Sequence, residues 1–259
     1  MGQILQYDHV EISYNGTPVV HDISFALNEG EILGIVGESG SGKSTLIRAA
    51  MGLLGDTGMV TRGDILYKGK NCPDLKEKEM RLLNGPELGM IFQNASSSFC
   101  AIRTVGTQLF ESMKEHRNLS KREFMTEAEA LFSRLGFEDA GRILSSCPFE
   151  LSGGMAQRVG VAAAMLMKPS VLLADEPTSA LDVSIQKQVA EEMLAINQEF
   201  GTSIILVTHN IGLIRFMAEK VLVMRNGEAM EYGETDRVLN QPEHEYTKRL
   251  LAAVPRLKR

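Results

Sequence analysis

The alternation of apolar and polar residues predicts strands at the start of the chain. Residues 10–14 and 23–27 alternate, and Asn15 and Gly16 between them form a dipeptide typical of a hairpin turn. The next apolar run, residues 32–36, is almost continuous, as in a parallel strand that is covered on both faces. This part of the chain therefore predicts an antiparallel hairpin followed by a central parallel strand.

Helical spacing dominates the middle of the chain. Residues 44–51 predict a helix, residues 56–92 predict short strands and turns, and residues 95–168 are mostly helical. Within the last segment, Ser120 and Glu123 have the spacing of a capping box, and apolar residues then recur at helical spacing.

Strand-like runs return in the last third of the chain, at residues 171–174 and 204–207. Between them a helix is predicted to begin at an Asp182 cap and to end at Gly201. A last short strand at residues 220–224 precedes a C-terminal helix. This alternation of strands and helices is typical of the α/β class.

Composition narrows the class of protein further. The chain has 259 residues, 44% of them hydrophobic, and a formal net charge of −6. The apolar content argues against a mainly disordered chain, and no apolar run approaches the roughly 18–20 residues that span a bilayer. The acidic balance argues against sequence-independent binding of nucleic acid. The three cysteines lack C-x-x-C spacing, which predicts reduced thiols.

A phosphate-binding loop is predicted directly after the first parallel strand. The segment from Gly37 to Thr45 matches G-x-x-x-x-G-K-[ST] between an apolar run and a helix, the setting that this motif requires. Backbone N–H groups of such a loop surround phosphates, while Lys43 would reach the β- and γ-phosphates and the Ser44 hydroxyl would bind Mg²⁺. The alternative is a glycine- and serine-rich surface turn.

Two adjacent carboxylates follow the apolar strand at residues 171–174. At the carboxyl end of a parallel strand, Asp175 can hold Mg²⁺ through its hydration shell. Glu176 is then placed to deprotonate or orient the water that attacks the γ-phosphate. Taken alone, the pair could equally be a solvated strand end.

Together these residues resemble the ATP-binding cassette (ABC) ATPases. The segment Leu-Ser-Gly-Gly-Met-Ala-Gln at residues 151–157 looks like the signature loop of that family. The resemblance implies that Ser152, Gly153 and Gly154 contact the nucleotide of an opposite subunit. Met155 departs from the glutamine of the family consensus, although the peptide and nickel importers share this departure.

Further motifs follow in the order of the family. Gln93 resembles the glutamine that contacts Mg²⁺ and senses the membrane subunit, residues 179–182 resemble the D-loop, and His209 resembles the histidine that contacts the γ-phosphate. Tyr14 resembles the aromatic residue that stacks on adenine. Asp182 also fits a helix cap, and the two roles are compatible. Alternatives remain for two residues: His209 could be structural, and Tyr14 could be an ordinary strand residue.

The resemblance implies the fold and the site. The fold is a P-loop NTPase with a RecA-like core and an N-terminal antiparallel β subdomain (1–94 and 166–259), and with an inserted helical subdomain (95–165). The implied nucleotide contacts are Tyr14, Gly37, Ser39, Gly40, Ser41, Gly42, Lys43, Ser44, Thr45, Gln93, Ser152, Gly153, Gly154 and Asp182. The implied catalytic residues are Lys43, Glu176 and His209, and those near Mg²⁺ are Ser44, Gln93 and Asp175.

The tail at residues 244–255 is similar to that of the peptide and nickel importer ATPases. Many peptide importers of that subset continue into a cysteine-bearing extension, so an end at Arg259 favours a nickel or metallophore type. The two Asn-Pro pairs usual after the glutamine are missing from residues 94–101, which predicts an unusual surface toward the membrane subunit.

The predicted function is ATP hydrolysis that drives import of peptides, nickel or metal chelates. The implied partners are membrane permease subunits, a second cassette (a copy or a paralogue) and, indirectly, an extracytoplasmic binding protein. The implied location is the cytoplasmic face of the cell membrane. One alternative is the same ATPase role for a different cargo. Two others are a soluble ABC ATPase acting on DNA or ribosomes, which usually carries coiled coils or fused cassettes, and a cassette that binds ATP without turnover.

Overall fold

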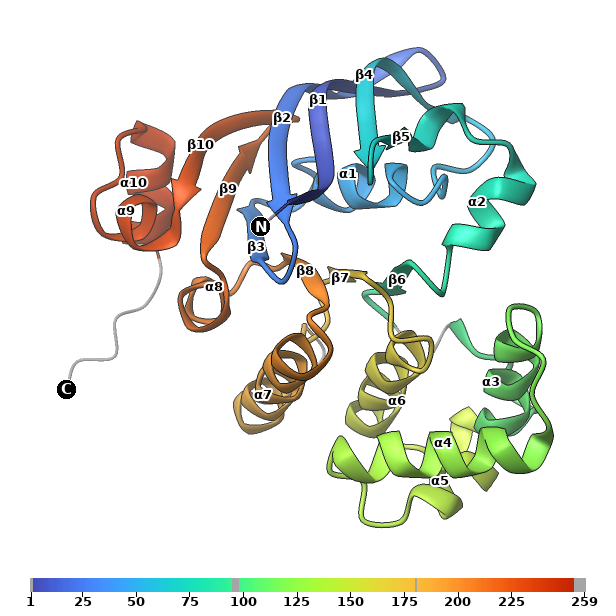
Figure 1. The fold of residues 1–259 in the computed structure, drawn as a ribbon. Coiled ribbons are helices and arrows are strands. Elements are labelled where there is room, and N and C mark those ends of the chain that lie inside the picture. Colours follow the sequence, from blue (N-terminus) through green and yellow to red (C-terminus); the bar gives the residue numbers. More distant parts are fainter. Residues whose placement is uncertain (1, 95–97, 180, 254–259) are drawn as a thin grey trace.

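The computed structural model describes residues 2–94, 98–179 and 181–253, whose strands form two sheets (Figure 1). The smaller, antiparallel sheet has the order β2 (Thr17–Asn28), β1 (Gln3–Tyr14), β4 (Gly58–Tyr67), β5 (Lys70–Asn71). Asn15 and Gly16 both have positive φ, at 49° and 77°. Such a turn matches the twist of the strands that it joins, so the predicted hairpin is confirmed.

The larger sheet has six strands. Their order is β10 (Glu228–Glu234), β9 (Lys220–Arg225), β3 (Ile32–Gly37), β8 (Ser203–Val207), β7 (Val171–Asp175), β6 (Leu88–Ile91). All neighbours are parallel except β10, which pairs antiparallel with β9. Every residue of β3, β7 and β8 is buried, as their continuous apolar runs predict.

Helices cover both faces of this sheet. The helices of the described residues are α1 (Lys43–Ala49), α2 (Glu77–Leu83), α3 (Val105–Lys114), α4 (Lys121–Arg134), α5 (Ala140–Ser145), α6 (Gly153–Met165), α7 (Val183–Phe200), α8 (Ile211–Met217), α9 (Thr235–Asn240) and α10 (Glu245–Ala252). Short 3₁₀ helices lie at Cys72–Asp74 and Pro148–Glu150. Helix α1 lies between the two sheets, and α6, α7 and α8 lie on the opposite side of the larger sheet (Figure 1).

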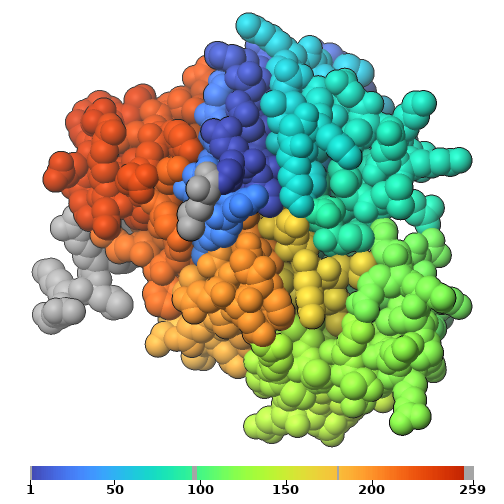
Figure 2. Space-filling view, in the orientation of Figure 1, coloured from blue at the N-terminus to red at the C-terminus, as the bar shows by residue number. Residues whose placement is uncertain are grey.

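Two apolar cores result from this layering. Leu33 and Ile35 of β3 pack with Leu46 and Ile47 of α1 in the core between the sheets. The alternate residues of β3, represented by Ile32, belong to the core shared with the helices on the other side, which continues into α3, α4 and α5. Those three helices form a lobe, coloured green at the lower right of Figure 2.

The predicted helix ends are confirmed at two helices. Ser120 accepts a hydrogen bond from the Glu123 N–H at 3.3 Å while the Glu123 carboxylate accepts one from the Ser120 N–H at 2.7 Å. Asp182 caps α7, and Gly201 ends it in the left-handed conformation at φ 66°. These local signals therefore set the limits of both helices.

The structure corrects two predictions made from the hydrophobic pattern. Helix α2 lies where short strands and turns were predicted, because its two turns bury little more than Met80 and give no clear period. The strand at residues 220–224 is not the last one, since β10 follows it. Strand β10 lies at the edge of the sheet and has no buried residue, so it lacks the apolar run by which strands are recognised.

None of the helices formed by the described ranges is long and apolar enough to cross a bilayer.

Candidate functional site

The phosphate-binding loop joins β3 to α1, and two of its glycines are required by the backbone. A Cβ on Gly37 would lie 2.1 Å from the carbonyl oxygen of Met224 on β9, which no side chain permits. Gly42 has φ +94° and lies against Val19 and Val20 of β2. Glycine at these positions therefore allows the loop to pass closely between two strands.

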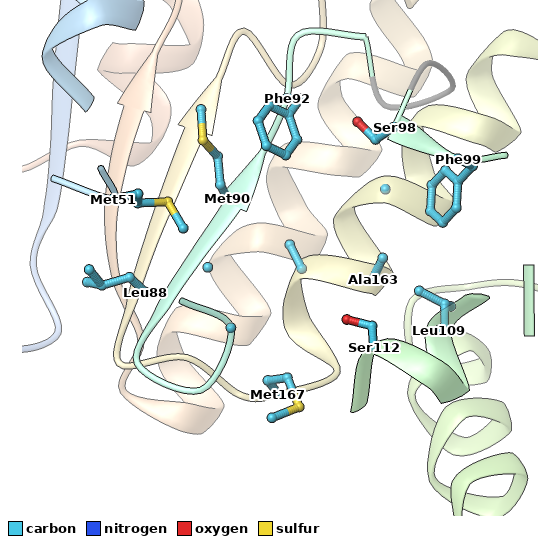
Figure 3. A pocket seen from close by; sticks show the side chains of 14 residues that line it. Met51, Leu88, Met90, Phe92, Ser98, Phe99, Leu109, Ser112, Ala163 and Met167 are labelled. Carbon is cyan, nitrogen blue, oxygen red and sulfur yellow. The ribbon is translucent and has the colours of Figure 1, made fainter. Parts of the chain in front are cut away.

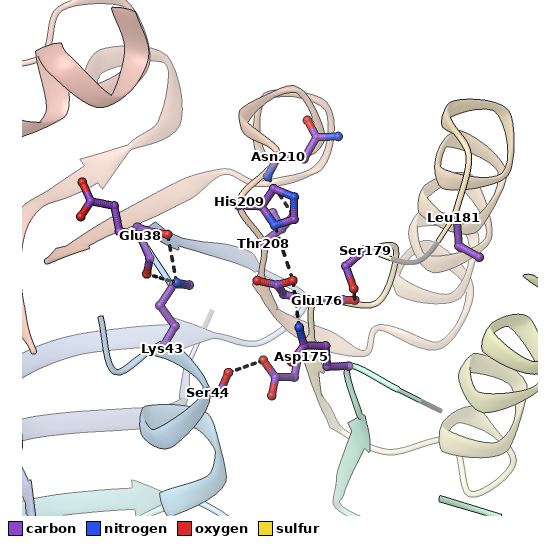
Figure 4. Close-up of polar contacts among 12 residues, drawn as sticks. Glu38, Lys43, Ser44, Asp175, Glu176, Ser179, Leu181, Thr208, His209 and Asn210 are labelled. Carbon is purple, nitrogen blue, oxygen red and sulfur yellow. Dashed lines mark hydrogen bonds and ion pairs between the residues drawn. The ribbon is translucent and has the colours of Figure 1, made fainter. Parts of the chain in front are cut away.

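Lys43 is held inside this loop. Its Nζ donates hydrogen bonds to the carbonyl oxygens of Gly37 at 2.9 Å and Glu38 at 2.7 Å, and only 6% of the residue is exposed (Figure 4). Burial lowers the pKa of Lys43, although the carboxylates of Glu176, Asp175 and Glu38 oppose this shift. Two backbone carbonyls of the loop therefore fix the position of the ammonium.

Asp175 connects the strand edge to α1. It is fully buried, and its carboxylate accepts a hydrogen bond from the Ser44 hydroxyl at 2.6 Å (Figure 4). The same carboxylate accepts a second hydrogen bond from Arg48 at 3.2 Å. Ser44 and Arg48 are four residues apart on α1, so one face of the helix presents both to the same carboxylate. The buried negative charge is therefore paired.

Glu176 lies beside Gln93 and His209, the two residues that the sequence also assigns to the nucleotide site. Its Oε2 lies 3.4 Å from Gln93 Nε2 and 3.5 Å from His209 Nδ1. The backbone of Glu176 has φ 45°, a left-handed conformation that is uncommon outside glycine, and its N–H donates to Val207 O at 2.9 Å. The chain thus turns sharply after β7 and directs this carboxylate toward the loop.

These residues enclose a cavity of about 250 Å³ at the carboxyl edge of the parallel strands. Its lining residues are Val19, Ser39, Gly40, Ser41, Gly42, Lys43, Ser44, Thr45, Gln93 and Glu176. The cavity combines loop N–H groups and one ammonium with a carboxylate, a pattern suited to a phosphate chain and an attacking water. Ser44 and Gln93 of this lining, and Asp175 behind Ser44, carry oxygens of the hard kind that fits Mg²⁺.

Tyr14 does not belong to this lining. It ends β1, is half-buried and packs against Gly58, where an added Cβ would lie 2.7 Å from its ring. Val19 of β2, which the sequence did not indicate, lines the cavity instead. The adenine contact of Tyr14 stays a prediction.

The predicted signature loop begins α6, and its Ser152, Gly153 and Gly154 do not line the cavity of the phosphate-binding loop. Ser152 is exposed and caps α6 by accepting from Met155 N–H at 3.3 Å, so the two glycines open that helix. Gly154 faces Leu181, from which its Cβ would be 3.6 Å away. This placement leaves the loop open to a second molecule, and its contact with a nucleotide stays a prediction.

Asp182 is the N-cap of α7, accepting from Ser184 N–H at 3.1 Å and Ile185 N–H at 3.0 Å. The hydrogen bond from the Ser184 hydroxyl, followed by those from the two backbone N–H groups, lowers the pKa of Asp182. The predicted helix cap is therefore confirmed, while the nucleotide contact of Asp182 stays a prediction. Ala180, in the same predicted D-loop, lies outside the described residues, as do residues 95–97 and 254–255 of two other predicted segments.

Sequence reasoning missed the residues that support the site. Arg48 follows Ser44 by one helical turn, a spacing that could have indicated a shared partner. Glu38 contributes a backbone carbonyl, and Val19 comes from a strand far from the motif, so neither carries a sequence signal.

A second cavity, of about 240 Å³, lies beyond Gln93. Figure 3 shows Met90 and Phe92 on one side and Phe99 and Leu109 on the other. Its walls are mainly apolar and come from β6, α3 and α6, so the cavity lies between the larger sheet and the helical lobe.

The sequence profile described as ABC transporter matches residues 20–179, more than half of the chain. The chain belongs to the ABC transporter family. It is an ATPase of that family, in which ATP hydrolysis is coupled to transport, and the predicted P-loop NTPase fold is confirmed.

Two curated relatives of this ABC cassette cover nearly all of it. The dipeptide transport ATP-binding protein DppD of Bacillus subtilis (strain 168) is 41% identical over 99% of the chain and 78% of its own length. The glutathione import ATP-binding protein GsiA of Escherichia coli (strain K12) is 40% identical over 99% of the chain. The cassette spans only 43% of the length of GsiA.

Solved structures show the same fold. The cassette MJ0796 in a dimeric post-hydrolysis state bound to ADP and Pi matches with a TM-score of 0.79 and 25% identity, covering 89% of this cassette and 98% of that chain. The cbiO1 protein of Clostridium perfringens, part of the transporter complex cbiONQ, matches with a TM-score of 0.80 and 26% identity, over 98% and 97% of the two chains.

Proposed function

We propose that the chain is the ATP-hydrolysing subunit of a peptide importer, with its reaction centre in the cavity of the phosphate-binding loop. The observation that carries this proposal is the approach of Gln93 and His209 to Glu176 beside Lys43. Four segments far apart in the sequence bring to one place the groups that phosphoryl transfer to water needs.

The geometry suggests a role for each group. Loop N–H groups and Lys43 bind and orient the β- and γ-phosphates. Glu176 accepts the proton of the attacking water, and His209, whose Nδ1 lies 3.5 Å from Glu176 Oε2, contacts the γ-phosphate. Ser44, Asp175 and Gln93 would hold Mg²⁺, which supplies charge neutralisation at the phosphates.

A second cassette would complete the site. The exposed Ser152 and the glycines that follow begin α6, and the N-terminus of a helix favours an anion. In a dimer these groups would cap the γ-phosphate bound by the other cassette, a copy or a paralogue. The dimeric state of the cassette MJ0796 supports this arrangement.

The apolar cavity beyond Gln93 would receive the permease. Its walls come from both the larger sheet and the helical lobe, so a bound segment would respond to movement between them. This arrangement would place the chain at the cytoplasmic face of the membrane. A permease segment in this cavity would contact both the predicted helical subdomain (95–165) and the core (1–94 and 166–259).

A peptide is the cargo that the relatives favour. The names of the B. subtilis and E. coli relatives specify a dipeptide and glutathione, which is a tripeptide, and both proteins align with almost the whole chain. Nickel and metal chelates remain the alternative class of cargo.

Uptake measurements test the proposal. Cells with the wild-type chain or with Lys43→Ala would be given a labelled dipeptide and, separately, labelled nickel. Loss of dipeptide uptake alone in the variant is the expected result. Loss of nickel uptake alone would show that nickel, and not a peptide, is the cargo. Unchanged uptake of both would overturn the assignment as a peptide or nickel importer.

A further inference from the structure

The phosphate-binding loop is contacted from outside by the C-terminal helix. Tyr246, in the first turn of α10, has a hydroxyl that accepts a hydrogen bond from the Glu38 N–H at 3.3 Å, across 208 positions of sequence. Only 3% of Tyr246 is exposed. A residue near the end of the described chain therefore contacts the loop that holds Lys43.

Tyr246 is fixed from two directions. The guanidinium of Arg225, at the end of β9, lies 4.9 Å from the centre of its ring. The carboxylate of Glu231 on β10 accepts hydrogen bonds from the backbone N–H groups of Glu243 at 3.0 Å and His244 at 3.2 Å, which holds the start of α10. The hydroxyl is thus presented by a rigid support.

Glu38 connects this support to Lys43. Its N–H donates to Tyr246, while its carbonyl oxygen accepts from Lys43 Nζ at 2.7 Å. The same C-terminal segment reaches the loop a second time, because the Gly227 N–H donates to the carbonyl oxygen of Ser41 at 3.1 Å. Burial raises the pKa of Tyr246, so its hydroxyl stays protonated and neutral at physiological pH.

We propose that Tyr246 is a positioning residue for ATP binding: it holds Glu38 in the conformation whose carbonyl aims Lys43 at the phosphates. A loop ordered before the ligand arrives loses less conformational freedom on binding, so affinity rises without any contact between Tyr246 and ATP. This inference rests on the proposed phosphate-binding role of Lys43. It assigns to α10 a role in the nucleotide site.

The test is Tyr246→Phe, which removes the hydroxyl and keeps the ring beneath Arg225. The matched control is Tyr232→Phe, because the Tyr232 hydroxyl donates to Ala26 O at 3.1 Å, a contact outside the loop. Calorimetric titration of the full chain with ATP and Mg²⁺ gives Kd, and ATPase assays of the assembled transporter give KM and kcat.

Loss of one hydrogen bond is expected to raise Kd and KM about three- to tenfold, with kcat nearly unchanged and Tyr232→Phe like the wild type. Equal Kd values for Tyr246→Phe and the wild type would overturn the inference, as would a fall in melting temperature with no change in Kd. Lys43→Ala distinguishes failure of this inference from failure of the proposed function. If the Lys43→Ala protein bound ATP normally, the proposed phosphate-binding role of Lys43 would be wrong.

Discussion

The Ser44 hydroxyl donates a 2.6 Å hydrogen bond to Asp175, although 131 positions separate the two residues. Ser44 lies in the first turn of α1, and Asp175 is the last residue of β7. The bond joins the phosphate-binding loop to the acidic strand end, the two halves of the proposed Mg²⁺ site. Arg48 neutralises the same buried carboxylate, so the oxygens are assembled and charge-balanced together.

Asp175→Asn tests this assembly. The amide lacks the negative charge that pairs with Arg48 and attracts a divalent cation, so we expect the Mg²⁺ concentration for half-maximal ATPase activity to rise about 10- to 100-fold. Titration of the transporter's ATPase rate with Mg²⁺ measures this. Asp56→Asn, at an exposed turn, is the control and should match the wild type. An unchanged Mg²⁺ requirement in Asp175→Asn would contradict the assignment.

Glu176→Gln separates ATP binding from hydrolysis. The amide retains the shape and the hydrogen-bonding reach toward Gln93 but cannot accept a proton from water, so we expect kcat to fall about 10²- to 10⁴-fold. Binding of ATP should remain, because Lys43 and the loop are intact. Steady-state ATPase assays and equilibrium titration measure the two properties. Glu228→Gln, on the exposed edge strand, is the control, and a Glu176→Gln protein with wild-type turnover would refute the catalytic role.

Much of the fold and of the site could be predicted because the relevant signals are local. The run at β3, the glycines and lysine after it, and the carboxylates after β7 each lie within a few residues. Parallel strands end at the same edge of a sheet, which brings these segments together without further information. The prediction of Lys43, Ser44 and Asp175 as neighbours follows from this rule.

The remainder depends on contacts between distant segments. Strand β10 has no buried residue, and the hydrogen bond between Tyr246 and Glu38 uses a backbone N–H that any residue could supply. Tyr14 has an aromatic side chain suited to adenine, yet it does not line the cavity of the phosphate-binding loop. Val19 lines that cavity instead. No pattern within one segment specifies these outcomes.

Gly37→Ala tests the close contact between the loop and β9. The new Cβ would lie 2.1 Å from Met224 O, a backbone atom that cannot rotate away, so β9 or the loop must shift. Gly40→Ala is the matched control: it also has positive φ, but no atom lies within 4 Å of its Cβ, so only strain of roughly 1–2 kcal/mol is expected. Urea denaturation and ATP titration should show a larger loss of both stability and affinity for Gly37→Ala. Equal losses would contradict the steric explanation.

The buried pair between Arg158 and Glu192 predicts a pH effect on stability. Arg158 on α6 lies 2.8 Å from Glu192 on α7, and their side chains are 13% and 9% exposed. Burial raises the pKa of Glu192, and the charge and hydrogen bond of Arg158 offset this shift only in part. The folded protein therefore binds more protons at this group than the unfolded chain does, at pH values between the two pKa values.

Under these conditions the free energy of unfolding falls as pH rises through that window. Because glutamine does not titrate, the stability of the wild type relative to Glu192→Gln should be greater at about pH 5 than at about pH 7.5. Urea denaturation of both proteins at the two pH values measures the difference, in which other titrating groups cancel. Glu191→Gln, an exposed neighbour on α7, should change stability by less than about 0.5 kcal/mol at pH 7.5. If the wild type instead gained stability over Glu192→Gln with rising pH, the ion pair would outweigh burial, and Arg158 would hold α6 to α7 chiefly by charge.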